Sequence, residues 1–227
     1  DHSLRFASSL ADASRPAPAR TGEDTALLIA DPAFDALHSP ELPRLRGARA
    51  EVEALRALYP NPRNVVLSGT GATRAAVAAD AQRATVIHYA GHAVFNDAVP
   101  GQSYLVLAGS GVTGELSADS ISKMHLPRLR LVVLSACRTL PSRGGRSGGF
   151  AGLSGALLAA GAGGVVGSVW NVDDSLAQPL MLDFHRKYLR SGNAAEALRE
   201  AQLSLLRSRD LAMRSPAVWA GFRYAGR

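Results

Sequence analysis

The chain has 227 residues, of which 47% are hydrophobic and 19% are charged, so it can bury the core of one large domain. No apolar run approaches the roughly 18 residues of a membrane-spanning helix, and no signal-peptide pattern opens the chain. The first residue is not Met, which fits a fragment of a longer protein. We therefore expect one domain, or one domain with a tail, and no membrane partner.

The formal net charge is +6, and nearly all of the basic residues are Arg. These Arg residues are scattered, with no basic block and no interleaved aromatic residues, so we do not expect direct nucleic-acid binding. Cys137 is the only cysteine, which excludes an internal disulfide and favours a reducing, cytoplasmic setting.

Residues 1–22 are rich in Ala, Ser, Pro and Arg and read as a linker or a surface-docked tail, which leaves 23–227 as the folded domain. Strands are predicted at 25–30, 64–69, 84–91, 103–109, 129–136, 163–170 and 217–226. Helices are predicted within 42–60 and at 73–82, 117–124, 152–162, 174–190 and 193–207.

Continuous apolar strands separated by helices indicate an α/β fold, with a mostly parallel sheet flanked by helices on both faces. Two helix starts carry capping signals. Ser117 or Asp119 can cap the helix at 117–124, and Asn193 with Glu196 resembles a capping box.

Ligand and active sites of open parallel sheets form outside the carboxyl ends of the strands. His92 follows the strand at 84–91, and Cys137 follows the strand at 129–136. If these strands are neighbours, about 5 Å apart, the thiol and the imidazole can face each other. A thiolate would then attack a carbonyl carbon while the imidazole handles protons.

A lone cysteine after an apolar strand is more often a buried space-filler than a nucleophile. The matching position of His92 favours the catalytic interpretation, as do the small residues around both side chains, which leave room for a substrate. The backbone amides of Ala93 and Cys137 are the candidate oxyanion donors, because an N–H group needs no particular side chain.

The stretches VIHYAGHAVFND, LVVLSACRTL, GLSGALLAAGAGGVVGSVWNVDD and SPAVWAGF together resemble the CHAT domain, a caspase- and separase-like cysteine peptidase domain of clan CD, which also holds gingipains. The resemblance runs from about residue 25 to residue 226. It implies a caspase-like fold and a catalytic dyad of His92 and Cys137. One departure is Ala93, where many members have Gly; the amide donor is retained unless the site needs a backbone angle that only Gly tolerates.

His88 and His92 form an H-x-x-x-H pattern that a helix would turn into a metal-binding pair. On a strand the two residues share a face but lie about 13 Å apart, too far for one ion. We therefore expect no metal site and assign His88 to packing in the sheet or to supporting the site by a hydrogen bond.

Asp173 and Asp174 follow another strand end, in SVWNVDD. One interpretation is that they cap the helix at 174–190 and face its positive end. The other is an acidic S1 pocket, because the segment resembles the separase motif Trp-Asp-Val-Thr-Asp, which is associated with Arg before the scissile bond. The resemblance then implies a preference for a basic P1 residue.

The stretch RTLPSRGGRSGGF after Cys137 is rich in Gly, Ser and Arg and is expected to be an exposed loop. The corresponding region is cut when caspases are activated. An acidic S1 pocket would make Arg143 and Arg146 candidate autocleavage sites; the alternative is an uncut loop that binds substrate.

The resemblance implies a bacterial cysteine endopeptidase that acts on a protein or peptide substrate without a cofactor, although calcium dependence occurs in some relatives. CHAT domains often follow TPR or other sensor modules in defence or cell-death proteins, and some cut bacterial gasdermins. Two alternatives remain open: a non-catalytic interaction module with the same fold, and another thiol hydrolase or acyl transferase.

Overall fold

The structure is a computed structural model that describes residues 2–7, 22–37, 40–43, 45–136, 139–140, 152–170, 172 and 174–226, with the backbone alone for 46, 174 and 175. Its centre is a six-stranded sheet in the order β2-β1-β3-β7-β8-β9. Five strands are parallel and β9 is antiparallel to β8. Their bounds are β1 Ala26–Pro32, β2 Val65–Gly69, β3 Val86–Ala90, β7 Leu131–Ser135, β8 Gly164–Ser168 and β9 Phe222–Gly226.

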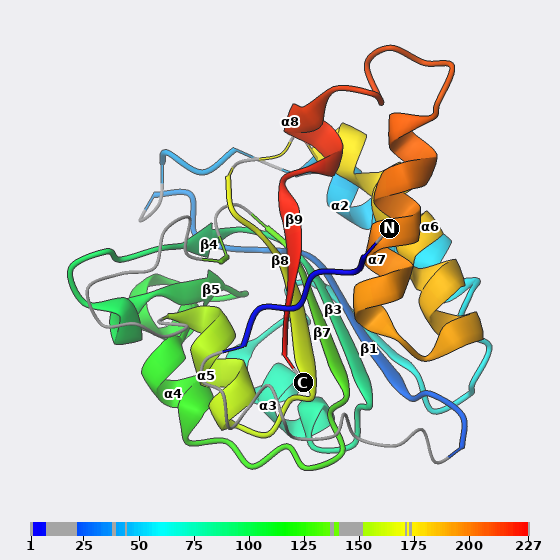
Figure 1. Cartoon of the computed structure of the whole chain (residues 1–227). Helices are drawn as coiled ribbons and strands as arrows, with labels where there is room; N and C mark the ends of the chain where they lie inside the picture. Colours follow the sequence, from blue (N-terminus) through cyan, green and yellow to red (C-terminus); the bar gives the residue numbers. More distant parts are fainter. Residues whose placement is uncertain are drawn as a thin grey trace.

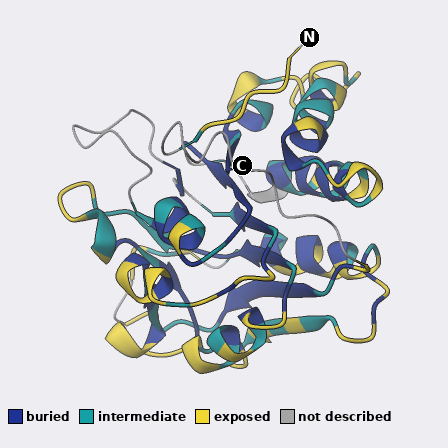
Figure 2. Ribbon diagram, turned by 60° about the horizontal axis from the view of Figure 1, so that its bottom comes forward, coloured by how far each residue is buried: buried dark blue, intermediate teal, exposed yellow. Residues whose placement is uncertain are grey.

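Helices cover both faces of this sheet (Figure 1). One face packs against α2 (Arg46–Arg56), α6 (Asp174–Ser191) and α7 (Ala194–Leu206). The other face packs against α3 (Arg74–Ala81), α4 (Ala118–Ser122) and α5 (Leu153–Ala159). Because successive side chains of a strand point to opposite faces, β3 sends Val86, His88 and Ala90 into the first core and Ile87 and Tyr89 into the second. Figure 2 shows the buried sheet between these layers.

The predicted α/β architecture with a mostly parallel sheet is confirmed. The first five strands of the sheet lie within or close to the predicted ranges. Two predicted capping signals are also present: Ser117 accepts a hydrogen bond from Ser120 N, and Asn193 accepts one from Glu196 N.

Two strand predictions need correction. The run at 217–226 is not one strand, because Pro216–Trp219 form the short helix α8 before β9 begins. The run at 103–109 does contain a strand, β5 (Tyr104–Val106), but it lies outside the main sheet. It pairs antiparallel with β4 (Ala93–Val94) and β6 (Glu115–Ser117) in a three-stranded sheet. Strands of two or three residues are too short to produce a recognisable alternating pattern.

The remaining connections include two 3₁₀ turns, η1 (Pro100–Gln102) and η2 (Gly111–Gly114). Within the part of the chain that the structure describes, no helix is both long and apolar enough to cross a membrane. The boundary between a tail at 1–22 and a domain at 23–227 stays a prediction, and residues 8–21 lie outside the described residues.

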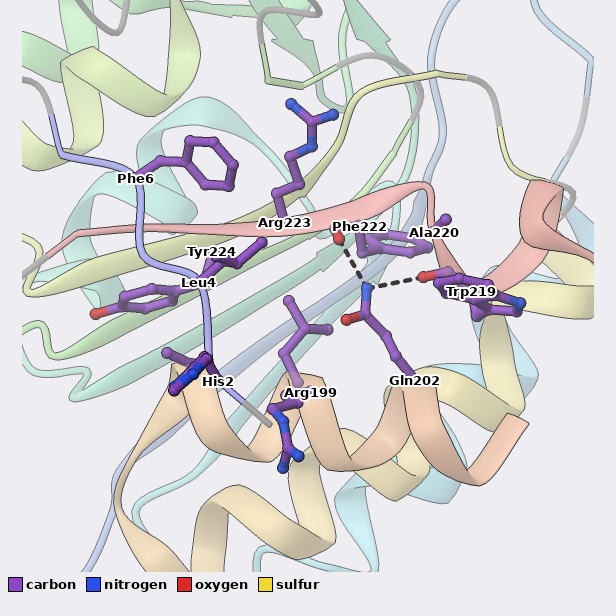
Figure 3. Close-up of a pocket in the computed structure, with 12 residues that line it drawn as sticks. His2, Leu4, Phe6, Arg199, Gln202, Trp219, Ala220, Phe222, Arg223 and Tyr224 are labelled. Atoms are coloured by element: carbon purple, nitrogen blue, oxygen red, sulfur yellow. Dashed lines mark hydrogen bonds between the residues drawn. The ribbon is translucent and has the colours of Figure 1, made fainter. Parts of the chain in front are cut away.

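Residues 2–7 lie beside β9, with Phe6 in a parallel bridge to Ala225. Phe6 N donates to Tyr224 O at 3.2 Å, and Gly226 N donates to Phe6 O at 2.9 Å. The guanidinium of Arg223 lies 5.3 Å from the centroid of the Phe6 ring. Residues 2–7 form one wall of a pocket of about 420 Å³ that lies between β9 and α7 (Figure 3). On the far wall of this pocket, the Gln202 amide donates to the carbonyls of Trp219 and Phe222.

A chain of four polar side chains crosses the first core. Tyr59 Oη lies 2.7 Å from His185 Nδ1, and His185 Nε2 lies 3.1 Å from His88 Nδ1. His88 Nε2 lies 2.7 Å from Glu51 Oε1, at an alignment that falls short of a hydrogen bond. All four side chains are buried. Glu51 and His185 contact opposite nitrogens of His88, so these groups form a line and do not converge on a point as metal ligands would.

We expect acid to destabilise the fold through His185. Burial, and secondarily the neighbouring His88, lower the pKa of His185 well below its ordinary value. Below about pH 6.5 the unfolded state therefore binds a proton that the folded state excludes, so stability falls by up to about 1.4 kcal/mol per pH unit. Urea unfolding between about pH 5 and pH 7 measures this slope.

The matched variants for this experiment are His185→Gln, which removes the buried titrating ring, and His2→Gln, which removes an exposed one. The slope should become smaller in the first variant and stay unchanged in the second. Equal slopes in all three proteins would contradict the assignment.

Candidate active site

The site lies at the carboxyl ends of β3 and β7, which are adjacent parallel strands. Their last residues, Ala90 and Ser135, are directly opposite each other. His92 and Cys137 each follow two residues later. The condition on which the facing of the thiol and the imidazole depends, that the two strands are neighbours, is therefore met, although Cys137 itself lies outside the described residues.

His92 is 8% exposed, and its imidazole has a defined hydrogen-bond partner. Its Nε2 lies 2.6 Å from the carbonyl oxygen of Pro43, which precedes α2. A carbonyl oxygen can only accept, so Nε2 carries the proton and Nδ1 is the basic nitrogen of the neutral ring. Phe34, which follows β1, packs edge-on against the imidazole with a centroid distance of 5.5 Å. The ring is thus held in one tautomer and one orientation.

The backbone around His92 is fixed from the second core by Tyr89. The hydroxyl of Tyr89 lies 2.6 Å from His92 O and 2.7 Å from Val106 O, so it bonds the end of β3 to β5. Gly91 lies over the same ring, and a Cβ at that position would come within 2.5 Å of Tyr89 Oη. The Gly between β3 and His92 is therefore required by this close approach.

The backbone N–H of Ala93 points away from β5, its neighbour in the three-stranded sheet. Val106 N donates to His92 O at 2.9 Å, and the His92 carbonyl and the Ala93 N–H belong to the same trans peptide, in which they point in opposite directions. Ala93 lies in β4. Among the described residues other than Gly, only Asp31 has a positive φ, so Ala93 does not. Ala93 in place of Gly thus causes no backbone strain.

The chain on both sides of Cys137 is tied to the end of β8 by Ser168. Its hydroxyl donates to Ala136 O at 2.5 Å, and its amide donates to Thr139 Oγ1 at 3.0 Å. Leu140 N donates to Ser168 O at 2.8 Å. Both Ser168 and Thr139 are buried. One residue of β8, Ser168, therefore holds the described residues on both sides of positions 137–138.

Of the remaining predicted site residues, the structure describes only the backbone of Asp174. Cys137, Arg143, Arg146 and Asp173 lie outside the described residues. Asp174 is the first residue of α6, and its side chain is not described. Among the described residues, no cluster of three or more His, Cys, Asp or Glu side chains could hold a metal ion.

Sequence reasoning did not identify Pro43, Tyr89 or Ser168. Pro43 acts through a backbone carbonyl, which no residue type signals. Tyr89 and Ser168 look like ordinary strand residues in VIHYA and GVVGS, because their partners are distant in sequence. The one available signal was Gly91 next to a strand end, since an isolated Gly there suggests close backbone approach.

Comparison with solved structures defines the class of fold. The gingipain R (RgpB) structure of Porphyromonas gingivalis, described as an Arg-specific cysteine proteinase, has a TM-score of 0.56 at 9% identity, covering 89% of this chain and 46% of that one. The Saccharomyces cerevisiae separase–securin complex has a TM-score of 0.59 at 14% identity, and the match covers 98% of this chain and 12% of that one. Caspase-1 of Spodoptera frugiperda has a TM-score of 0.51 at 12% identity, and the match covers 93% of each chain. The fold is that of the caspase-like cysteine peptidases.

The sequence matches the family profile described as CHAT domain over residues 1–227, so the chain belongs to the CHAT domain family. No curated protein sequence matches it. The chain spans about half the length of the gingipain chain and a small part of the separase chain. Family and fold together support a cysteine peptidase.

Replacing Gly91 by Ala should destabilise the protein. The new Cβ would overlap the ring of Tyr89, which is fully buried and cannot move aside. We expect a loss of about 1–3 kcal/mol, measured by urea unfolding. Gly71→Ala is the control, because its Cβ would come no closer than 3.4 Å to any neighbour. A loss in the Gly91 variant no larger than in this control would count against the close approach.

Replacing Ser168 by Ala should also destabilise the protein, because Ala136 O loses its hydroxyl donor. We expect a loss of about 1–2 kcal/mol, again by urea unfolding. Ser154→Ala is a matched control, since this serine is equally buried but its hydroxyl has no hydrogen-bond partner among the described residues. Similar stabilities for the two variants would mean that the bond to Ala136 contributes little.

Proposed function

We propose that this chain is a cysteine endopeptidase whose dyad is His92 and Cys137. The observation that carries the proposal is the register of β3 and β7, because Ala90 and Ser135 are opposite each other and each is followed two residues later by one member of the dyad. The CHAT family match and the caspase-like fold support the same enzyme class. The alternative of a buried, inert cysteine leaves the oriented imidazole of His92 without a role.

The proposed reaction uses the tautomer that Pro43 enforces. The thiol of Cys137 gives its proton to Nδ1 of His92, and the thiolate attacks the scissile carbonyl carbon. The oxyanion is held by backbone amides, for which Ala93 N–H is one candidate and Cys137 N–H the other. His92 then protonates the leaving amine, and an acyl-enzyme forms. Water, deprotonated by His92, attacks the thioester carbonyl, releases the acid and restores the thiol.

The proposed substrates are proteins or peptides with a basic P1 residue. The support is the Asp173–Asp174 pair after β8, which would pair with a guanidinium or ammonium group, together with the description of gingipain R as Arg-specific. A role of these residues in starting α6 remains compatible with the same positions. Under this proposal Arg143 and Arg146 are candidate autocleavage sites.

The proposed setting is limited proteolysis in bacterial defence or cell death, in the cytoplasm. The enzyme would be controlled by a sensor or TPR-type module in the same parent chain or complex, and a bacterial gasdermin is a candidate substrate. The support for this setting is membership of the CHAT family alone.

A peptide library that varies P1 over all residues tests the activity. We expect cleavage after Arg or Lys that disappears in Cys137→Ala and in His92→Ala. Asp174→Asn should lower kcat/KM for Arg at P1 by about tenfold or more, since a charged partner is lost. Cleavage that survives in Cys137→Ala would refute the mechanism, and a preference for acidic or large apolar P1 residues would refute the pocket assignment.

Autocleavage is tested on the purified chain by intact-mass measurement during prolonged incubation. Fragments ending at Arg143 or Arg146 that are absent from Cys137→Ala would support it, and an unchanged mass would refute it. Complete inactivity, with the sensor module or activating partner present, would favour the interaction-module alternative.

A further inference from the structure

The buried polar line of Tyr59, His185, His88 and Glu51 links the helix α2 to the strand that leads to His92. Glu51 lies in α2, Tyr59 lies three residues after α2 ends, and His88 lies in β3. His185, in α6, stands between Tyr59 and His88. The polar line therefore joins α2, α6 and β3 inside the first core.

Burying the side chains of this polar line costs free energy. Glu51 is 1% exposed, and His88 and His185 are both 0% exposed. Burying charged and polar groups costs free energy that apolar side chains of similar size would avoid, and such replacements are often neutral or stabilising. The surrounding core consists of apolar residues that could fill the same space. What polar contacts add, compared with apolar packing, is a fixed position of one element on another.

Two contacts join the same pair of segments. Within the core, Glu51 of α2 lies 2.7 Å from His88 of β3. Beyond the strand end, Pro43, which precedes α2, holds His92, which follows β3. The start of α2 has no side-chain capping bond at Leu45. Because Pro43 is only three residues before the first residue of α2, its position is coupled through the chain to where α2 lies against the sheet.

We propose that the line Tyr59–His185–His88–Glu51 is a positioning element for His92. It holds α2 in place on β3 and thereby keeps the Pro43 carbonyl on His92 Nε2. A small displacement of α2 breaks the 2.6 Å bond and frees the imidazole to rotate. The role as a catalytic positioner rests on the proposed function, whereas the effect on the Pro43–His92 bond does not.

The test compares two substitutions at one position. Glu51→Leu keeps the volume and removes the group facing His88, whereas Glu51→Gln keeps an oxygen acceptor there. Displacement of catalytic groups by about 1 Å can cost about a hundredfold in rate, so we expect kcat to fall at least tenfold in Glu51→Leu with KM within about twofold. Glu51→Gln should retain most of the activity. Leu205→Ala, a buried change in α7 away from the α2–β3 contact, controls for lost stability.

A second readout needs no turnover. The hydrogen-bonded Nε2–H of His92 should give a slowly exchanging imidazole proton resonance in NMR, assigned by its loss in His92→Gln. We expect this resonance to disappear in Glu51→Leu and to persist in Glu51→Gln and Leu205→Ala. A resonance that persists in Glu51→Leu would overturn the proposal. If the wild-type chain cleaved no peptide, the peptidase function would fail while this readout still decided the positioning role.

If Glu51→Leu does not fold, Tyr59→Phe provides the same test, because it removes only the hydroxyl that contacts His185 Nδ1. We expect a weakened, faster-exchanging His92 resonance and a several-fold lower kcat. An unchanged resonance in Tyr59→Phe would overturn the proposal in that case.

Discussion

The parallel pairing of β3 with β7 is the constraint on which the rest of the site depends. Because Ala90 and Ser135 are opposite each other, the two segments that leave these strands start from the same edge of the sheet. A shift of one residue in this register would turn one whole strand over and exchange its two faces. The next strand along, β8, continues the arrangement by placing Ser168 at the same edge, where it bonds the chain on both sides of Cys137. Three neighbouring strand ends thus contribute to the candidate site.

His92 is supported from both layers of helices, because β3 alternates between them. On one face, His88 contacts Glu51 and His185; on the other face, Tyr89 bonds the carbonyl of His92. The first contact acts through α2 and Pro43, and the second acts on the backbone itself. A cysteine peptidase needs its imidazole oriented before substrate arrives, since fixed geometry supplies much of the rate acceleration. The second core thus holds the backbone of His92, and the first core, in the role proposed for the polar line, keeps the Pro43 carbonyl on its imidazole.

Much of the fold follows from local patterns in the sequence. The continuous apolar runs TALLIA, ATVIHYAG and LRLVVLSA predict buried parallel strands, and each is found close to its predicted range. The position of His92 beyond a strand end also follows from the sequence once the sheet is parallel. The contacts of His92 do not: the Pro43 carbonyl lies 49 residues away in sequence, and a backbone oxygen has no residue signature. The same holds for His88, which is identifiable as buried but whose partners come from two helices.

The short segment around Phe6 has a consequence for how the sheet ends. β9 is the last strand of the sheet, and an unpaired edge is a template on which another extended chain can assemble. Phe6 occupies the backbone groups of Tyr224 and Gly226, and Gln202 occupies the carbonyl of Phe222. One aromatic residue and one amide side chain thus pair three backbone groups on the outer edge of β9 within the chain itself. An added strand would have to displace these bonds before it could extend the sheet on this side.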